Sequence, residues 1–155
     1  MNRHWIWLAV AALLAITLVA TACGGDDDDE ASDASPSAEV QEVSVKMTAD
    51  LTFEPDEIRV EANRPVRLTV DNTDAATLHD FTVMEMPVTS VHTEGGSAGM
   101  EHGDMSDAAM HMAMEGGMTG GMIEFTPTEP GEYQFECTEA NHAEAGMTGT
   151  LIVTE

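Results

Sequence analysis

Four side chains that can bind a soft metal are placed in two short segments of the sequence. Cys137, His142 and Met147 follow one another at even intervals in FECTEANHAEAGM, and His79 begins the segment HDFTV. A thiolate, two imidazoles and a weak thioether suit a trigonal copper site with a long axial Met. Each residue alone has a simpler explanation, because a lone cysteine on a core face is usually a packing residue. The metal interpretation therefore depends on a fold that brings all four together.

Short β-rich segments separated by Gly or Pro fill the chain from about Val43 to Glu155. They are VSVKMT, EIRV, PVRLTVDN, HDFTVME, MIEFTP, GEYQFEC and GTLIVTE. About seven short strands in about 110 residues predict an antiparallel sandwich or barrel. In GEYQFEC the alternation puts Tyr133, Phe135 and Cys137 on one face, so we expect Cys137 to start from the buried side.

Several of these segments, in order, resemble the cupredoxins, the small blue-copper sandwiches. FEPDEIRVEANRPVRLTVDN is similar to the early strand pair of that family, and HDF to the segment with its first histidine. PGEYQFECTEANHAEAGMTGTLIV is similar to its ligand loop and closing strand. The spacing Cys-x4-His-x4-Met lies within the range of the family. Asn63 stands where the family often has Gly at a turn, a mild departure because Asn tolerates a positive φ.

The resemblance implies an all-β, Greek-key antiparallel β-sandwich over residues 43–155. It also implies one mononuclear type 1 copper, held by His79, Cys137, His142 and Met147. Asp80 directly follows His79 and is a candidate for joining the two ligand segments through hydrogen bonds. The alternative for Asp80 is a solvated acid at a strand end.

Two classes of function remain after the motifs are considered. The first is a blue-copper protein that carries one electron by cycling between Cu(I) and Cu(II), and the second is an extracytoplasmic protein for copper acquisition, delivery or tolerance. A binuclear electron-transfer site would need a second cysteine in positions 138–146, which contain none. The sequence has no P-loop, nucleophile elbow or paired catalytic carboxylates. We therefore expect a protein that is not an enzyme.

A Met- and His-rich insert at about residues 88–121 is the basis of the second class. Thioethers bind Cu(I) without losing a proton, so the insert could collect copper for the main site. Its candidate accessory ligands are Met100, His102, Met105, Met110, His111, Met112, Met114 and Met118.

Two other interpretations of the insert remain open. One is a short helix from Asp104 or Ser106 to Gly116, with Met105, Ala109 and Met112 facing the sandwich as a lid. The other is a sacrificial sink for oxidants.

The N-terminus predicts export and attachment to a membrane. Residues 1–22 read as a signal peptide, and LVATAC resembles the lipobox of bacterial lipoproteins, in which Cys23 would be lipidated. Ordinary cleavage after Ala22 and an uncleaved anchor are the alternatives. All three place the rest of the chain outside the cytoplasm, on the periplasmic or cell-surface side. The acidic residues 23–42 lack apolar periodicity and predict a disordered tether.

Charge is strongly one-sided, with 29 acidic against 5 basic residues and a formal net charge of −24. Nucleic acid and anionic lipid surfaces are poor partners for such a chain. We expect instead a redox partner protein with a basic docking patch.

Overall fold

The computed structural model describes residues 39–96, 105 and 107–155. The predicted signal peptide, Cys23 and most of the predicted tether lie outside the described residues, as do Met100 and His102 of the insert. Within the described part there is no helix of the length and hydrophobicity that a bilayer crossing requires.

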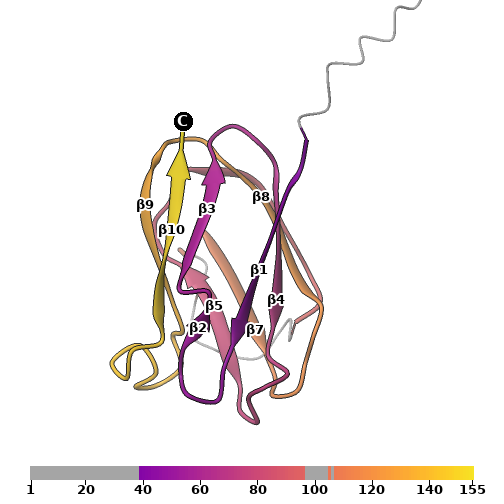
Figure 1. Ribbon diagram of the computed structural model, residues 1–155, viewed down its shortest axis with the longest axis vertical. Coiled ribbons are helices and arrows are strands. Elements are labelled where there is room, and N and C mark those ends of the chain that lie inside the picture. The colour runs from indigo at the N-terminus through magenta and orange to yellow at the C-terminus, as the bar shows by residue number, and fades with distance from the viewer. Residues whose placement is uncertain (1–38, 97–104, 106) are drawn as a thin grey trace, which may run out of the picture. The chain divides into compact units, whose positions relative to one another are not determined.

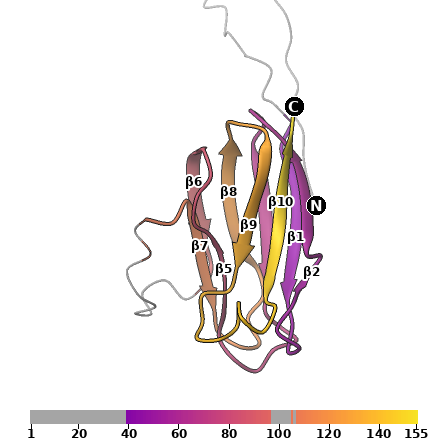
Figure 2. The ribbon, with the colours of Figure 1, turned by 90° about the vertical axis from the view of Figure 1, so that its left-hand side faces the viewer.

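Ten strands in this part of the chain form two five-stranded sheets that face each other as a sandwich (Figures 1 and 2). The first sheet has the order β2-β1-β4-β8-β6, made of Phe53–Glu54, Gln41–Met47, Val66–Asp71, Gly121–Pro127 and Val88–Glu94. The second has the order β3-β10-β9-β5-β7, made of Glu57–Glu61, Thr148–Thr154, Gly131–Glu136, His79–Val83 and Met110–Met114. The predicted two-sheet sandwich is confirmed, and its first strand begins at Gln41, slightly before Val43.

Two strand pairs differ from the purely antiparallel arrangement that we expected. Strand β1 pairs with β4 in parallel, and β3 pairs with β10 in parallel. Each pair is parallel because of how its two strands are connected. Between them the chain crosses to the opposite sheet, and it then returns to the sheet of the first strand, at the end where that strand began. The turn between β3 and β4 contains Asn63 with φ 59°, the conformation that Asn tolerates.

The core lies between the sheets and is built by alternation along the strands. In β8 every second residue is buried, and the buried residues of β4 are Val66, Leu68 and Val70. Three phenylalanine rings meet in the core, with centroid distances of 6.0 Å for Phe53–Phe81, 5.0 Å for Phe53–Phe135 and 4.8 Å for Phe81–Phe135. Such aromatic contacts add to the stability gained from burial. Phe81 is on β5, which begins at His79, and Phe135 is on β9, which ends just before Cys137. The aromatic contacts therefore hold these two strands together.

The insert contributes an edge strand to each sheet. Strand β6 pairs with β8, and β7 pairs with β5 over five positions, from His79 opposite Met114 to Val83 opposite Met110. The interpretation of a helix continuing to Gly116 is therefore wrong for residues 110–114. Spacing between Met105, Ala109 and Met112 suggested a helix, but the period of two through Met110, Met112 and Met114 is the one that matches burial.

The methionines of β7 are part of the core. Met110, Met112 and Met114 are 2%, 3% and 0% exposed, and Ala109 packs against the same cluster. This segment is therefore a strand of the second sheet and not a helical lid on the sandwich. A Cβ at Gly121 would lie 2.6 Å from Sδ of Met112 and 2.7 Å from Sδ of Met114. The two thioethers thus occupy the space over the backbone of β8.

We expect Met112→Ala to lower the free energy of unfolding of the metal-free protein by about 2–5 kcal/mol, because it leaves a cavity in the core. The control is Met84→Ala, at a methionine that is 42% exposed, for which a change within about 0.5 kcal/mol is expected. Urea unfolding followed by circular dichroism measures both. Equal effects would show that β7 does not form part of the core.

Candidate metal centre

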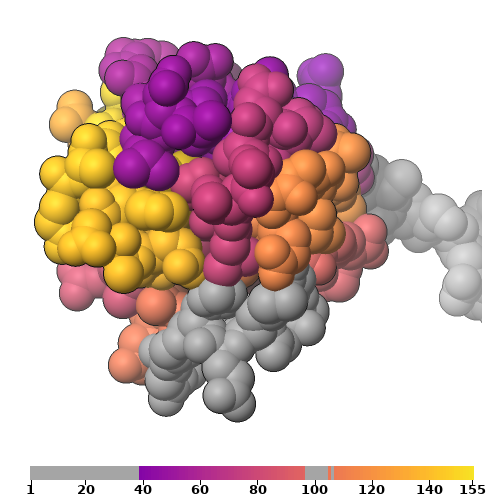
Figure 3. Space-filling view, turned by 90° about the horizontal axis from the view of Figure 1, so that it is seen from below, coloured from indigo at the N-terminus to yellow at the C-terminus, as the bar shows by residue number. Residues whose placement is uncertain are grey.

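The donor side chains come from two neighbouring strands and the loop between β9 and β10. His79 is the first residue of β5, and Cys137 directly follows β9. His142 lies in the loop, and Met147 directly precedes β10. Strands β5 and β9 are paired at Thr82 and Glu136, so the ends that carry His79 and Cys137 are adjacent. In the view onto this end of the sandwich, the loop in yellow lies beside the pink segment that leads into β5 (Figure 3).

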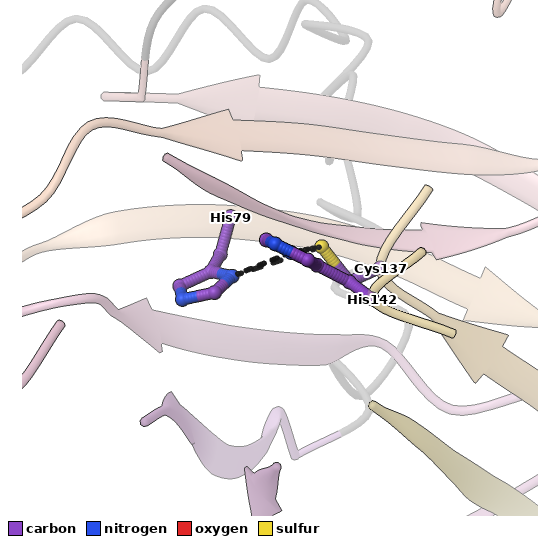
Figure 4. A group of neighbouring side chains, drawn as sticks. All are labelled: His79, Cys137 and His142. Carbon is purple, nitrogen blue, oxygen red and sulfur yellow. Dashed lines mark hydrogen bonds between the residues drawn. The ribbon is translucent and has the colours of Figure 1, made fainter. Parts of the chain in front are cut away.

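The structure brings His79, Cys137 and His142 together with their donor atoms converging (Figure 4). Nδ1 of His79 is 3.2 Å from Nδ1 of His142, and Sγ of Cys137 is 3.8 Å and 3.4 Å from these nitrogens. A point equidistant from the three atoms lies about 2.0 Å from each, close to the roughly 2.0–2.3 Å that a first-row metal such as zinc takes to imidazole and thiolate. The separations of the three donor atoms therefore suit one metal ion of this size.

The loop is closed by its own backbone hydrogen bonds. The Cys137 N–H donates to the Met147 carbonyl at 3.1 Å, and the Met147 N–H donates to the His142 carbonyl at 3.0 Å. Asn141 has φ 66° and Gly146 has φ 111°, so the tight path uses residues that tolerate positive φ. Met147 is fully buried. These contacts connect the three candidate ligands of the loop into one unit.

Burial sets the protonation of the metal-free site. His79 and Cys137 are both 0% exposed, whereas His142 is half-buried. Burial raises the pKa of the Cys137 thiol to about 12, so this group keeps its proton at neutral pH. Burial, and then the nearby His142, lower the pKa of His79. A neutral imidazole is the form that binds a metal.

Asp80 joins the two ligand segments. It is fully buried, and its backbone N–H donates to Sγ of Cys137 at 3.4 Å. Its carboxylate accepts the Thr138 N–H at 3.0 Å on both oxygens, and the Thr138 hydroxyl at 3.0 Å on Oδ2. Asp80 is therefore not a solvated acid in this structure. It ties the residue after His79 to the residue after Cys137.

Three residues that hold the ligand-bearing segments in place were not predicted from the sequence. Thr138 completes the Asp80 contacts, and the Thr77 hydroxyl lies 3.4 Å from Nε2 of His79. Buried Asn72 donates to the carbonyls of Thr77 and Met114 at 2.9 and 2.8 Å, which anchors the segment leading to His79. A polar residue in a turn is too common for any of these to have been recognised from the sequence.

His111 is the one candidate accessory histidine that the structure describes, and it is not part of this cluster. Among the His, Cys, Asp and Glu side chains that the structure describes, only His79, Cys137 and His142 gather closely enough to hold a metal ion. Met110, Met112 and Met114 are buried in the core, whereas Met105, His111 and Met118 are half-buried. Met100 and His102 lie outside the described residues. Collection of copper by the insert stays a prediction, with three of its proposed ligands inside the core.

Comparison with known proteins identifies the family. The sequence model described as "Cupredoxin-like domain" matches residues 8–103, more than half of the chain. The chain belongs to the cupredoxin-like family. No curated protein sequence matches this cupredoxin significantly.

Solved structures agree with this assignment. Auracyanin B is 25% identical with a TM-score of 0.58, covering 74% of this chain and 89% of its own. The reduced auracyanin from Roseiflexus castenholzii shares the fold. It is 21% identical with a TM-score of 0.57, and the match covers 76% of this chain and 99% of its own. Auracyanin A from Chloroflexus aurantiacus also shares the fold. It is 21% identical with a TM-score of 0.56, and the match covers 75% of this chain and 100% of its own. With this fold and the His79, Cys137, His142 and Met147 set, the cupredoxin has one type 1 copper site.

Copper binding at pH 7 should release the proton of Cys137, because a thiol with its pKa raised to about 12 is protonated there and binds as thiolate. The apparent affinity for copper then increases with pH, by up to about tenfold per unit across the neutral range. A pH indicator in weak buffer measures the release. Cys137→Ser, which keeps both imidazoles, is the control, and equal release from both proteins would contradict the assignment.

Proposed function

We propose that this cupredoxin is a membrane-tethered carrier of single electrons. The observation that supports the proposal most directly is the convergence of two imidazoles and one thiol at 3.2–3.8 Å, with His79 and Cys137 fully buried. Auracyanin A, a blue copper protein by its description, has the same fold. Copper supplies the redox step when bound, because Cu(I) and Cu(II) both accept this ligand set.

The role of the chain is to keep the donor atoms in place while the charge of the site changes. His79 is fixed at the start of β5, between the Asn72-anchored turn and the strand pairing with β7. Cys137 is fixed by β9 and Asp80, and the loop hydrogen bonds hold His142 and Met147. Since His142 alone of the three close donors is partly exposed, we propose that electrons enter and leave through its ring.

The cupredoxin loaded with one equivalent of Cu(II) should show an intense visible thiolate-to-copper band and the EPR spectrum of a type 1 site. Cys137→Ser should lose the band, since only the thiolate gives this transition. The matched control is His92→Ala, at an exposed histidine on β6 paired with Glu94, which should keep both spectra. If the unmodified protein lacks the band and instead binds several Cu(I) ions, it is a copper handler rather than a carrier.

We propose a basic protein as the redox partner. Glu136, Glu139 and Glu144 line a recess beside the ligand loop, where an electron would leave. Complementary charge mainly accelerates encounter, and salt screens it.

Glu139→Gln combined with Glu144→Gln should slow electron exchange with a small cationic reagent by roughly two- to tenfold at low salt. Stopped-flow absorption of the copper band measures the rate. Glu129→Gln with Glu155→Gln removes the same charge from the opposite ends of β9 and β10 and serves as control. If both pairs slow exchange equally, total charge rather than a docking surface is responsible.

We also propose that a lipid on Cys23 holds the cupredoxin on the extracytoplasmic side of a membrane. The support is the LVATAC segment with the acidic stretch after it. Cys23→Ser should move the protein from the membrane to the soluble fraction with its copper spectrum unchanged, and retention in the membrane would refute lipid anchoring.

A further inference from the structure

A buried threonine connects the copper centre to the Met- and His-rich insert. Thr82 of β5 is 0% exposed, and its Oγ1 lies 2.6 Å from Oδ1 of Asp80 and 2.8 Å from Nδ1 of His111. His111 stands opposite Thr82 in the β5–β7 pairing, so both side chains lie on the same face. Phe81 and Met112, on the other face, belong to the core. The contact is thus set by strand register.

The hydrogen count fixes the direction of these hydrogen bonds. Thr138 reaches the Asp80 oxygens with an N–H and a hydroxyl, and the Cys137 thiol reaches Oδ2 at 3.7 Å, so both oxygens act as acceptors. A hydroxyl has one hydrogen, and that of Thr82 points to Asp80. Nδ1 of His111 must therefore carry a hydrogen and donate it to Thr82. The chain of donors is His111 to Thr82 to Asp80.

Asp80 transmits this arrangement to the thiolate. Its N–H donates to Sγ of Cys137, and its carboxylate holds Thr138, the next residue. Hydrogen bonding around the cysteine sulfur tunes the redox potential of a blue-copper site. A carboxylate whose charge is drawn toward hydrogen-bond donors stabilises Cu(II) less than a free one, because less negative charge faces the metal.

We propose that His111 and Thr82 are positioning residues of the copper centre. His111 orients the Thr82 hydroxyl, which orients and partly neutralises the Asp80 carboxylate, and this raises the reduction potential. The insert then acts on the site through strand β7 rather than by collecting copper through His111. This inference rests on the proposed carrier function.

The test compares reduction potentials and visible spectra of the copper-loaded full chain. His111→Leu and Thr82→Val each remove one hydrogen-bonding group, whereas His111→Asn and Thr82→Ser retain one. His92→Leu on β6 is the control, an exposed histidine paired with Glu94. Protein-film voltammetry gives the reduction potential, and the thiolate-to-copper band shows whether the bond between the Cys137 sulfur and copper has changed.

We expect His111→Leu and Thr82→Val to lower the potential, shifting the Cu(II)/Cu(I) ratio by roughly three- to tenfold at fixed potential. Their double variant should shift it no further than the larger single one, because both break one chain. The retaining variants and His92→Leu should match the unmodified protein. The inference is overturned if His111→Leu leaves the potential unchanged, or if His111→Asn shifts it equally.

A measurement on the unmodified protein covers variants that do not fold. Nitrogen NMR of the Cu(I) form at pH 8 should show the neutral His111 ring protonated at Nδ1. A ring protonated at Nε2 overturns the inference while leaving the carrier function intact. If the unmodified protein has no blue band, the carrier function fails, and the inference fails with it.

Discussion

The buried Cys137 sulfur is the constraint on which the rest of the centre depends. A thiolate cannot lie in a core without compensating charge, and the metal-free chain avoids the problem by keeping the proton, with the thiol pKa raised to about 12. Two imidazole nitrogens 3.4 and 3.8 Å away supply the remaining donors for a metal that replaces that proton. The burial of Cys137 therefore affects both the affinity of the site for a metal and its redox chemistry.

Rigidity around the sulfur comes from contacts that are distant in sequence. Asp80 connects β5 to Thr138 after β9, and the Phe81–Phe135 contact fixes the same two strands from the core side. The edge strand β7 pairs with β5, on which Asp80 and Thr82 are fully buried. A carboxylate so buried is tolerated because its oxygens accept several donors. Strands β6 and β7 of the insert are therefore part of the sandwich.

Sequence patterns were sufficient where local periodicity decides the structure. Alternation in GEYQFEC predicted the buried side for Phe135 and Cys137, and both are fully buried. The turn at Asn63 was likewise predictable from backbone preference. The order of the strands and the parallel pairings were not, because they depend on how the chain crosses between sheets. Residues 110–114 were misleading, since alanine and methionine favour a helix by intrinsic propensity and only the pairing with β5 selects the strand. The Thr82 and His111 contact depends on that register and could not be foreseen.

X-ray absorption at the copper edge, on frozen protein in both oxidation states, tests most directly whether the chain holds the donors in place. We expect two nitrogen and one sulfur neighbours of copper at about 2.0–2.3 Å in each state, with little change between them. A copper without a short sulfur neighbour, or one that gains oxygen ligands on oxidation, would contradict it.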